Sequence, residues 1–259
     1  MKNETDAIQI DAIKTSNLTK RYGQKTAVDQ LNLTVREGEL FALLGVNGAG
    51  KTTTIRMLSC LSTPTEGKAE IYGFDVVQQK DEVKRRVGIS TQDTAVAENL
   101  TVEENLRFMA GIYADERTAK GKEGVNQKVE RILEIFHLGE VRRKIAKTLS
   151  GGWKRKLSIA MAIIGDPKVL YLDEPTLGLD VLARRELWKE IEALKDDMTI
   201  ILTTHYMEEA EALADRIAIM IDGKIVCHGT LAQLEEMTGE KGLEKVFISV
   251  AEGKGGNHE

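Results

Sequence analysis

A glycine-rich stretch places the strongest constraint on the fold of this chain. Residues 45–52, GVNGAGKT, fit the pattern GxxxxGK[ST], and the apolar run ELFALL at 39–44 comes directly before them. A helical pattern follows, with Ile55, Leu58 and Leu61 expected on one face. Glycines let successive backbone N–H groups point at one anion, and the helix N-terminus adds its positive end. We therefore predict a phosphate loop between a strand and a helix, with an ordinary glycine-rich turn as the alternative.

The residues of this phosphate loop have predictable roles. Lys51 is expected to reach the terminal phosphates of a nucleoside triphosphate, and the hydroxyl of Thr52 is expected to bind Mg²⁺. The middle positions present backbone to the ligand, so Val46 is replaceable there. The expected nucleotide contacts from the loop are Gly45, Val46, Asn47, Gly48, Ala49, Gly50, Lys51, Thr52 and Thr53.

Three further apolar runs have the length of buried strands: VLYL at 169–172, TIILTT at 199–204 and RIAIMI at 216–221. Helical patterns lie between them, which favours a parallel sheet with crossover helices. An Asp-Gly turn at 222–223 joins the last run to KIVCHG and indicates a hairpin. The predicted fold class is therefore α/β with a mixed sheet.

The rest of the chain divides by its residue patterns. Residues 94–166 indicate an inserted α-helical subdomain, because Thr101 and Glu104 form a capping-box pattern and VNQKVERILEIFHL has apolar residues at helical spacing. The N-terminal segments AIQIDAI and LNLTV alternate polar and apolar residues, as half-buried antiparallel strands do. We therefore assign residues 1–93 and 167–259 to a core that carries an antiparallel β subdomain.

Two adjacent carboxylates follow one of the predicted strands. Asp173 and Glu174 come directly after VLYL, where an open α/β sheet presents its ligand-facing edge. Asp173 is expected to support Mg²⁺ through its water shell, and Glu174 to polarise the water that attacks the γ-phosphate. His205 ends the run TIILTTH and is expected beside the same site, where it would orient Glu174 or the water. The alternatives are a solvated acidic turn and a structural histidine.

Charge and cysteine content limit the functions open to the chain. The 259 residues carry a net charge of −5, with a pI near 5.6, which argues against a broad nucleic-acid-binding face. Cys60 and Cys227 lack metal-ligand spacing and sit in apolar stretches, as reduced core residues of a cytosolic protein do. No segment approaches the roughly 18 apolar residues of a membrane span, so membrane work would need a partner chain. The polar end from about residue 251 indicates a flexible tail.

A second glycine-containing stretch points to a family. The signature segment, LSGGWKRKL at 149–157, lies just upstream of VLYLDEP and resembles the signature of the nucleotide-binding subunits of ABC transporters. Other motifs follow the order of that family from about Ile10 to Leu234. Tyr22 resembles its adenine-stacking aromatic, Gln92 its Q-loop glutamine, Asp180 its D-loop aspartate and His205 its switch histidine.

The resemblance implies a P-loop ATPase with a RecA-like core and with ATP and Mg²⁺ as cofactors. In this family the phosphate loop of one subunit and the signature of a second clamp the same ATP, so two ATP molecules hold a homodimer together. Asp180 would lie at the dimer interface, and Gln92 at the hinge into the helical subdomain. The resemblance assigns catalysis to Lys51, Gln92, Glu174 and His205, the metal to Thr52, Gln92 and Asp173, and contacts to the partner's ATP to Ser150, Gly151, Gly152 and Trp153.

Two positions depart from the family pattern. Trp153 stands where glutamine is usual and cannot accept a hydrogen bond, and Val46 stands where proline is common. We expect neither change to abolish hydrolysis, because Ser150 and the phosphate-facing glycines remain. The helix after the signature is expected to begin near Trp153. The charged triplet Lys-Arg-Lys at 154–156 is expected to be a solvated helix face, with support of the nucleotide's negative charge as the alternative.

The stretch NLTVEENLRFMAGIYA and the threonines after Lys51 resemble the ATPases of ABC-2 type exporters. That resemblance implies export through a separate transmembrane permease subunit, with the ATPase in the cytoplasm, peripheral on the inner face of the cell membrane. No nucleic-acid partner is expected. The alternatives are a soluble ABC ATPase that acts on ribosomes or DNA and a P-loop kinase with an acceptor pocket. A third, a regulatory binder without turnover, is disfavoured by the presence of Glu174.

Overall fold

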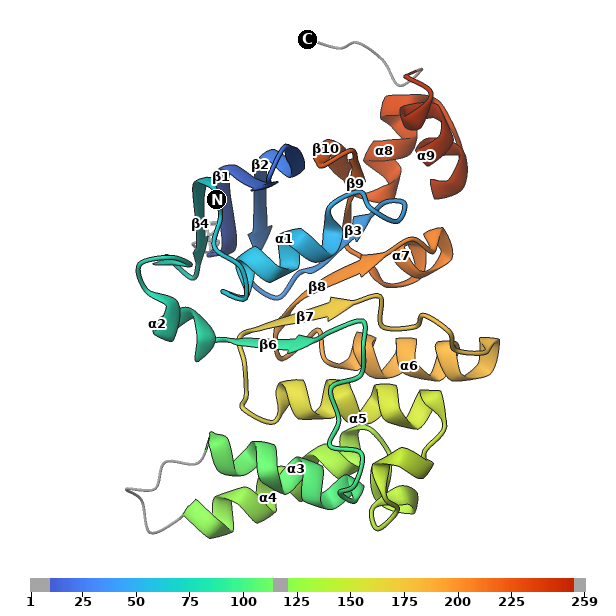
Figure 1. The fold of residues 1–259 in the computed structure, drawn as a ribbon. Coiled ribbons are helices and arrows are strands. Elements are labelled where there is room, and N and C mark those ends of the chain that lie inside the picture. The colour runs from blue at the N-terminus through green and yellow to red at the C-terminus, as the bar shows by residue number, and fades with distance from the viewer. Residues whose placement is uncertain (1–9, 114–120, 254–259) are drawn as a thin grey trace, which may run out of the picture.

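The computed structural model describes residues 10–113 and 121–253. Figure 1 shows an antiparallel sheet at the upper left, a six-stranded sheet across the middle, and helices α3 (Val102–Ile112) and α4 (Gly121–Ile135) at the bottom. This arrangement confirms the predicted α/β fold, with a mixed core sheet, an N-terminal antiparallel sheet and a helical insertion. The boundaries of the insertion at residues 94 and 166 stay a prediction.

The six-stranded sheet forms the core, in the order β10-β9-β3-β8-β7-β6. In that order the strands are β10 (Lys224–Gly229), β9 (Arg216–Ile221), β3 (Leu40–Leu44), β8 (Thr199–Thr204), β7 (Val169–Asp173) and β6 (Val87–Ser90). Neighbouring strands are parallel except β9 and β10, which form the hairpin expected from the Asp-Gly turn. Every residue of β3, β7 and β8 is buried, which explains why these strands lack a polar and apolar alternation.

Strand β6 is the core strand that the sequence pattern missed. It has only four residues, VGIS, and Gly88 is one of its two buried positions. A Cβ at Gly88 would lie 2.2 Å from the carbonyl oxygen of Ala162, in helix α5 (Gly151–Ile163). The strand lacks a side chain there because α5 packs directly against its backbone, and so it has no apolar run to recognise.

The second sheet has four antiparallel strands in the order β2-β1-β4-β5. These are β2 (Lys25–Arg36), β1 (Asp11–Tyr22), β4 (Glu66–Ile71) and β5 (Phe74–Asp75). The two predicted N-terminal strands lie in β1 and β2, although the first residues of AIQIDAI lie outside the described residues. Helix α1 (Lys51–Leu58) packs in one hydrophobic cluster with both sheets.

Helix α1 is shorter than its apolar pattern suggested. Ile55 and Leu58 are fully buried as predicted, but the helix ends at Leu58, and Leu61 is 56% exposed. Ser59 donates a hydrogen bond to the carbonyl oxygen of Ile55, and Cys60 adopts a φ of 61°, which ends the helical path. The prediction for Leu61 is therefore wrong, because the chain turns before this residue can join the buried face.

The helices cover the core sheet and form their own cluster. Thr101 caps α3 in the predicted capping box with Glu104. Helices α3, α4 and α5 share one hydrophobic cluster with residues of the core sheet. The other helical segments of the described residues are α2 (Lys80–Lys84), η1 (Leu138–Val141), η2 (Ala146–Thr148), α6 (Val181–Ala193), α7 (Met207–Leu213), α8 (Leu231–Thr238) and α9 (Leu243–Ala251).

Both cysteines are free thiols. Cys227 is buried as predicted, whereas Cys60 is only half-buried, because it stands in the turn after α1. The tail predicted from about residue 251 is covered only in part: Ala251 is the last residue of α9, and residues 254–259 lie outside the described residues.

Among the described residues, no helix combines the length and the apolar character that crossing a membrane requires.

Candidate active site

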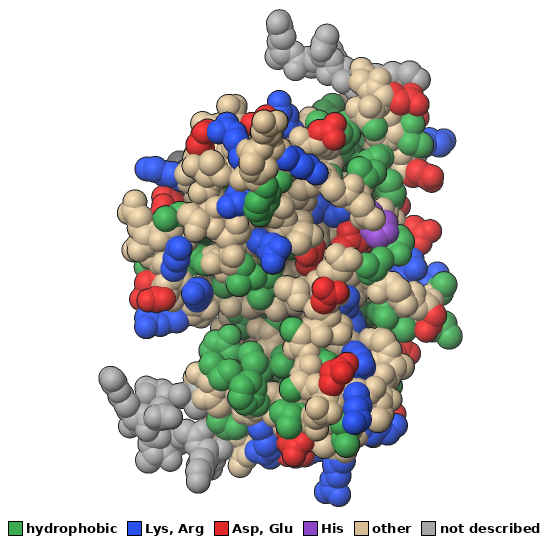
Figure 2. Space-filling model, viewed as in Figure 1, with side chains coloured by type: hydrophobic (Ala, Val, Ile, Leu, Met, Phe, Trp, Pro, Cys, Tyr) green, Lys and Arg blue, Asp and Glu red, His purple; other side chains and the backbone are tan. Residues whose placement is uncertain are grey.

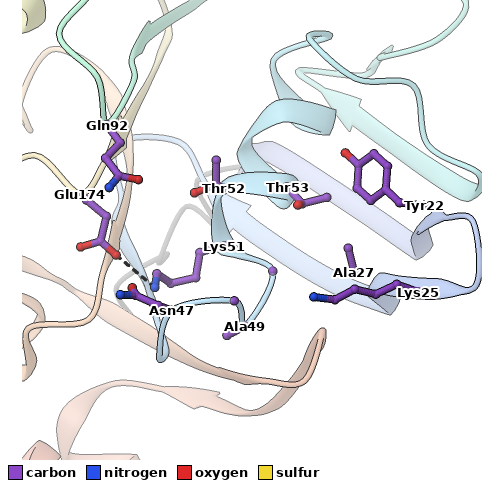
Figure 3. Close-up of a pocket in the computed structure, with 12 residues that line it drawn as sticks. Tyr22, Lys25, Ala27, Asn47, Ala49, Lys51, Thr52, Thr53, Gln92 and Glu174 are labelled. Atoms are coloured by element: carbon purple, nitrogen blue, oxygen red, sulfur yellow. Dashed lines mark ion pairs between the residues drawn. The ribbon is translucent and has the colours of Figure 1, made fainter.

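The carboxyl ends of the parallel strands β3, β6, β7 and β8 meet at one edge of the core sheet, where a cavity of about 420 Å³ opens. The phosphate loop contributes residues 47–53 to its lining. Figure 3 shows this loop in the middle of the site, with Glu174 on one side and Tyr22 on the other. Ligands of open α/β sheets bind at this edge. The fold thus gathers candidate residues from distant parts of the sequence.

Two glycines of the phosphate loop are required by close backbone contacts. A Cβ at Gly45 would lie 2.4 Å from the carbonyl oxygen of Met220, and a Cβ at Gly50 would lie 2.5 Å from that of Ala27. Gly50 also has a φ of 108°, a conformation that glycine adopts readily. A larger residue at either position would displace the loop from its path along the cavity.

Lys51, the first residue of α1, is buried, with 5% of its surface exposed. Its Nζ donates hydrogen bonds to the carbonyl oxygens of Gly45, at 2.7 Å, and Val46, at 3.3 Å. The same Nζ lies 3.1 Å from Oε1 of Glu174 (Figure 3). A buried ion pair persists only where further hydrogen bonds satisfy its atoms, and the two loop carbonyls do this for the ammonium. The predicted phosphate-binding lysine and the predicted base are therefore in contact.

Asp173 and Thr52 meet next to this pair. Oγ1 of Thr52 donates to Oδ1 of Asp173 at 3.1 Å, and Oγ1 of Thr203, on β8, donates to the same oxygen at 2.5 Å. One carboxylate and one hydroxyl are the hard oxygen donors of a Mg²⁺ site that takes its remaining ligands from water and substrate phosphates. No group of three or more His, Cys, Asp and Glu side chains among the described residues could hold a metal by itself. The donor set therefore fits Mg²⁺ that binds together with a phosphate ligand.

Glu174 and His205 form the second contact at the strand ends. Glu174 follows β7 with a φ of 50° and is 5% exposed, and its Oε2 lies 2.7 Å from Nδ1 of His205. His205 follows β8, and its ring packs on that of Tyr206 with 4.1 Å between centroids. The imidazole is therefore held beside the carboxylate, in the position that a residue orienting Glu174 needs.

A third buried carboxylate, besides Asp173 and Glu174, lies near this pair. Glu209 is fully buried in α7, and its Oε1 accepts hydrogen bonds from Oγ1 of Thr176 and Nε1 of Trp188. Burial raises the pKa of Glu209, and the negative charge of Glu174 raises it further. No local pattern indicates this group, because its two hydrogen-bond donors, Thr176 and Trp188, lie outside its own helix.

Tyr22 and Gln92 line the same cavity as the phosphate loop. Tyr22 is 51% exposed at the end of β1, and Nζ of Lys20 lies 5.1 Å from the centroid of its ring. Gln92 is exposed two residues after β6, and Figure 3 shows its side chain on the same side of the site as Glu174. Both residues therefore stand where an aromatic platform and a polar ligand of the predicted site would be needed.

The signature segment does not reach this cavity within one chain. Helix α5 begins at Gly151, earlier than the predicted start near Trp153, and Ser150 is its N-cap residue. The Ser150 side chain makes no capping hydrogen bond, and Gly151 is exposed. Gly151 lines a separate hollow of about 240 Å³ with Gln92 and Leu179. The hydroxyl of Ser150 and the helix start are thus open to a second molecule.

Trp153 and Asp180 flank the exposed helix start in different ways. Trp153 lines another hollow, of about 430 Å³, where Nζ of Lys156 lies 5.2 Å from its ring centroid. Asp180 is the N-cap of α6, and its Oδ1 accepts hydrogen bonds from the backbone N–H groups of Leu182 and Ala183, each at 3.0 Å. A capping role therefore belongs to Asp180 in addition to the interface position expected for it.

The prediction of a solvated face for the charged triplet is wrong for two of its three residues. Arg155 is 4% exposed and Lys156 7% exposed, since α5 packs between β6 and α6. Nζ of Lys156 lies 2.7 Å from Oε1 of the buried Glu190. Burial lowers the pKa of Arg155, whose guanidinium donates to backbone carbonyls. Lys154 alone keeps a partly exposed side chain, 3.4 Å from Glu98.

Besides Glu209, sequence reasoning missed three residues at the site. Lys25 and Ala27, on β2, line the cavity opposite Glu174. Thr203 bonds to Asp173, although it stood inside a predicted strand as an ordinary strand residue. The only indication in the sequence that Lys25 lies at the site was its position three residues after Tyr22. No motif distinguishes Lys25 from other surface lysines.

Comparison with known proteins gives independent information. The family model described as ABC transporter matches residues 28–177. The daunorubicin/doxorubicin resistance ATP-binding protein DrrA of Streptomyces peucetius is 42% identical over 233 residues, which cover 90% of this chain and 69% of the relative. The chain spans smaller shares of other curated relatives, 26% and 41% of the length of two of them.

Two solved structures resemble the whole fold. An ATP-binding subunit of an ABC transporter superimposes with a TM-score of 0.81 at 27% identity, covering 93% of this chain and 99% of that chain. The ATP-binding cassette MJ0796, in a dimeric post-hydrolysis state with bound ADP and Pi, gives a TM-score of 0.75 at 26% identity, covering 85% of this chain and 98% of that chain.

Proposed function

The chain belongs to the ABC transporter family as an ATP-binding and ATP-hydrolysing subunit, and from that premise we propose that it works as a homodimer around two shared ATP molecules. For the hydrolytic step at each site, the observation that carries the proposal is the contact of Glu174 with both Lys51 and His205 beside the phosphate loop. A carboxylate held between a phosphate-binding lysine and an imidazole is placed to accept a proton from an attacking water.

Each residue of this cluster has its own task in the proposed reaction. Lys51 exchanges its contact with Glu174 for the terminal phosphate, which frees one carboxylate oxygen for the water. His205 keeps the other oxygen oriented through its Nδ1. Thr52, Gln92 and Asp173 would hold Mg²⁺, which supplies positive charge that neutralises the phosphates. Tyr22 offers an exposed ring for the base to stack on.

The surface next to the signature segment supports a second copy of the chain as partner. Ser150 has an uncommitted hydroxyl, and a Cβ at Gly151 would lie 4.0 Å from the side chain of Leu179, so the signature and the segment before Asp180 are neighbours. Val181 and Leu182 follow, with 61% and 75% of their surfaces exposed. Apolar residues so exposed on a polar surface suit an interface. Ser150, Gly151, Gly152 and Trp153 would then contact the partner's ATP, with Asp180 at the interface.

A membrane subunit is the second proposed partner. DrrA is named as an ATP-binding protein of resistance to two drugs, which supports export as the direction. Export through a membrane subunit would place this chain on the inner face of the cell membrane. Figure 2 shows hydrophobic side chains gathered at the lower left, and Phe108, Ile112 and Tyr113 are exposed in that part of the molecule, at the end of α3. An apolar group of this kind suits docking of a membrane-embedded chain. Nucleic acid is not a proposed partner.

The homodimer is tested with Glu174→Gln, which keeps the phosphate contacts and removes the base. Light scattering should give a monomer without nucleotide or with Mg-ADP, and a dimer with Mg-ATP. The matched control is Glu174→Gln combined with Ser150→Arg, which should bind a fluorescent ATP analogue and remain monomeric, because arginine fills the partner's contact. Dimerisation of both variants alike would contradict the shared site.

The membrane partner is tested by expressing the chain with and without a permease gene from its neighbourhood. The chain should sediment with membranes only when the permease is present, and the Phe108→Asp variant should lose most of this association. Sedimentation that is independent of the permease would contradict this part of the proposal.

A further inference from the structure

Arg155 makes an unusual pair of contacts for a buried arginine. It lies in the second turn of α5, five residues after Ser150, with 4% of its surface exposed. Its Nη1 donates to the carbonyl oxygen of Thr91 at 2.8 Å, and its Nη2 donates to that of Gln92 at 2.7 Å. Across the described part of the chain, no carboxylate oxygen forms an ion pair with it within 4.0 Å. Each terminal nitrogen of the guanidinium therefore donates one hydrogen bond to one of two successive backbone carbonyls.

This arrangement costs free energy of folding, and the geometry of the guanidinium indicates what it provides. Burying a cation with no carboxylate in direct contact costs several kcal/mol even after relaxation. Burial lowers the pKa of Arg155 and outweighs the negative charges of Asp173, Asp93 and Glu209, which favour the charged guanidinium from a greater distance. The planar fork of arginine matches two adjacent acceptors, whereas a lysine ammonium is a point charge. Arg155 therefore forms hydrogen bonds to two consecutive peptide units at once, which a shorter side chain or a lysine at this position could not do.

The segment that Arg155 holds has few other ties. Pairing of β6 with β7 ends at Ser90, and the chain leaves the sheet at Thr91. Ser90 itself contacts α5, with 2.9 Å between its Oγ and that of Ser158. The next backbone hydrogen bond along the segment is local, from the N–H of Val96 to the carbonyl oxygen of Thr94. Helix α5 is thus the element that supports the chain on both sides of Ser90.

We propose that Arg155 locks residues 91–92 to helix α5, so that Gln92 and the signature segment keep one relative position and move together when nucleotide binds. Arg155 is a positioning residue that acts through Gln92, and it does not line the cavity that contains the phosphate loop. Gln92 lines the cavity of its own chain, whereas Ser150 is not among the residues that line that cavity. The lock therefore links binding of nucleotide in the chain's own cavity to the orientation of its signature segment, which in the proposed dimer contacts the partner's nucleotide. Its effect on hydrolysis rests on the proposed function, but the lock itself does not.

Hydrogen–deuterium exchange without nucleotide tests the lock directly. In Arg155→Met, which keeps the apolar stem and loses the donors, amide exchange over residues 91–95 should accelerate about ten-fold or more, because the segment opens locally. Arg155→Lys should give an intermediate rate. The matched control is Arg131→Met in α4, where the arginine is 54% exposed and lies 3.3 Å from Asp166, and it should exchange like the parent.

The exchange of β9, residues 216–221, serves as the internal reference for global unfolding. If β9 also exchanges faster in Arg155→Met, the milder Arg155→Lys variant decides the matter. Exchange over residues 91–95 at the parental rate in both Arg155 variants would overturn the proposal.

A double-mutant cycle tests the route of action. Arg155→Met should lower kcat about ten-fold and leave KM for ATP nearly unchanged, since the phosphate loop and Tyr22 are untouched. In a Gln92→Ala background the same substitution should lower kcat by less than about two-fold, because residues acting as a unit are not additive. Fully additive losses would overturn action through Gln92. A parent protein that hydrolyses no ATP would refute the proposed function, and the exchange result would still decide the lock.

Discussion

Oε2 of Glu174 lies 2.7 Å from Nδ1 of His205, although 31 positions separate the two residues in the chain. They meet because β7 and β8 are parallel neighbours that end at the same edge of the core sheet. The other oxygen of Glu174 contacts Lys51, so both oxygens of one buried carboxylate have a partner. From these two contacts we predict different effects of substituting His205 and Lys51.

Substitution His205→Ala should lower kcat about 10²-fold or more, the usual contribution of a positioned acid–base partner, while ATP affinity stays near that of the parent. Phosphate release measures the first quantity and a fluorescent ATP analogue the second. The matched control is His228→Ala, in which the lost histidine, on β10, contacts Arg216 and does not line the cavity. A kcat within about two-fold of the parent would show that His205 has a structural role only.

Substitution Lys51→Met should abolish stabilisation by Mg-ATP. The parent should gain about 2.7 kcal/mol at a nucleotide concentration 100 times Kd, because only the folded protein binds. Thermal unfolding with and without Mg-ATP measures this gain. The free Lys51→Met protein should also lose about 1–3 kcal/mol, since Glu174 keeps its charge and loses a partner, and adding Glu174→Gln should recover part of that loss. An unchanged thermal shift would contradict the role of Lys51.

Substitution Gly50→Ala should destabilise the protein by at least about 2 kcal/mol, because its Cβ would meet the carbonyl oxygen of Ala27 and the φ of 108° is strained for alanine. The matched control is Gly111→Ala in α3, where no atom lies within 4 Å of the new Cβ, and stability should rise by about 0.5–1 kcal/mol. Urea unfolding measures both changes. Equal stability of the two variants would contradict the close packing of the phosphate loop.

The helical part should lose stability in acid through Glu103. Hydrogen bonds from Arg142, and then from Arg107, hold the pKa of Glu103 at about 2, below its ordinary 4.5. Because the folded-state pKa is the lower one, the carboxylate stabilises the fold above about pH 4.5, and this contribution disappears as the pH falls toward 2.

Glu103→Gln should therefore unfold about 1–2 kcal/mol more easily than the parent near pH 7, a figure reduced for the partial exposure of the pair. The difference should vanish as the pH falls through this range, and Arg142→Met should show the same trend. Denaturant unfolding between pH 2 and 7 measures it. A difference that does not depend on pH would refute the assignment.

Much of this protein was readable from local pattern. The strands β3, β7, β8 and β9 are short apolar runs, the Asp-Gly turn specifies a hairpin, and Thr101 with Glu104 specifies the start of a helix. The phosphate loop needs glycines because its backbone passes close to other backbone atoms, and the spacing of the glycines in the sequence indicates this requirement. Such features depend on residues within a few positions of each other, so a sequence contains all the information that they require.

Only the tertiary structure decided which distant groups meet. Strand β6 was not recognised because the carbonyl oxygen of Ala162 leaves no room for a side chain at Gly88. Leu61 is exposed because the chain turns after α1. Arg155 and Lys156 have the sequence pattern of surface charges, yet both are buried. Arg155 donates to the carbonyl oxygen of Gln92, 63 positions away, and Lys156 donates to Glu190, 34 positions away. A charged side chain is stable in the interior only with a partner, and packing of remote elements, which no local period encodes, determines whether that partner is present.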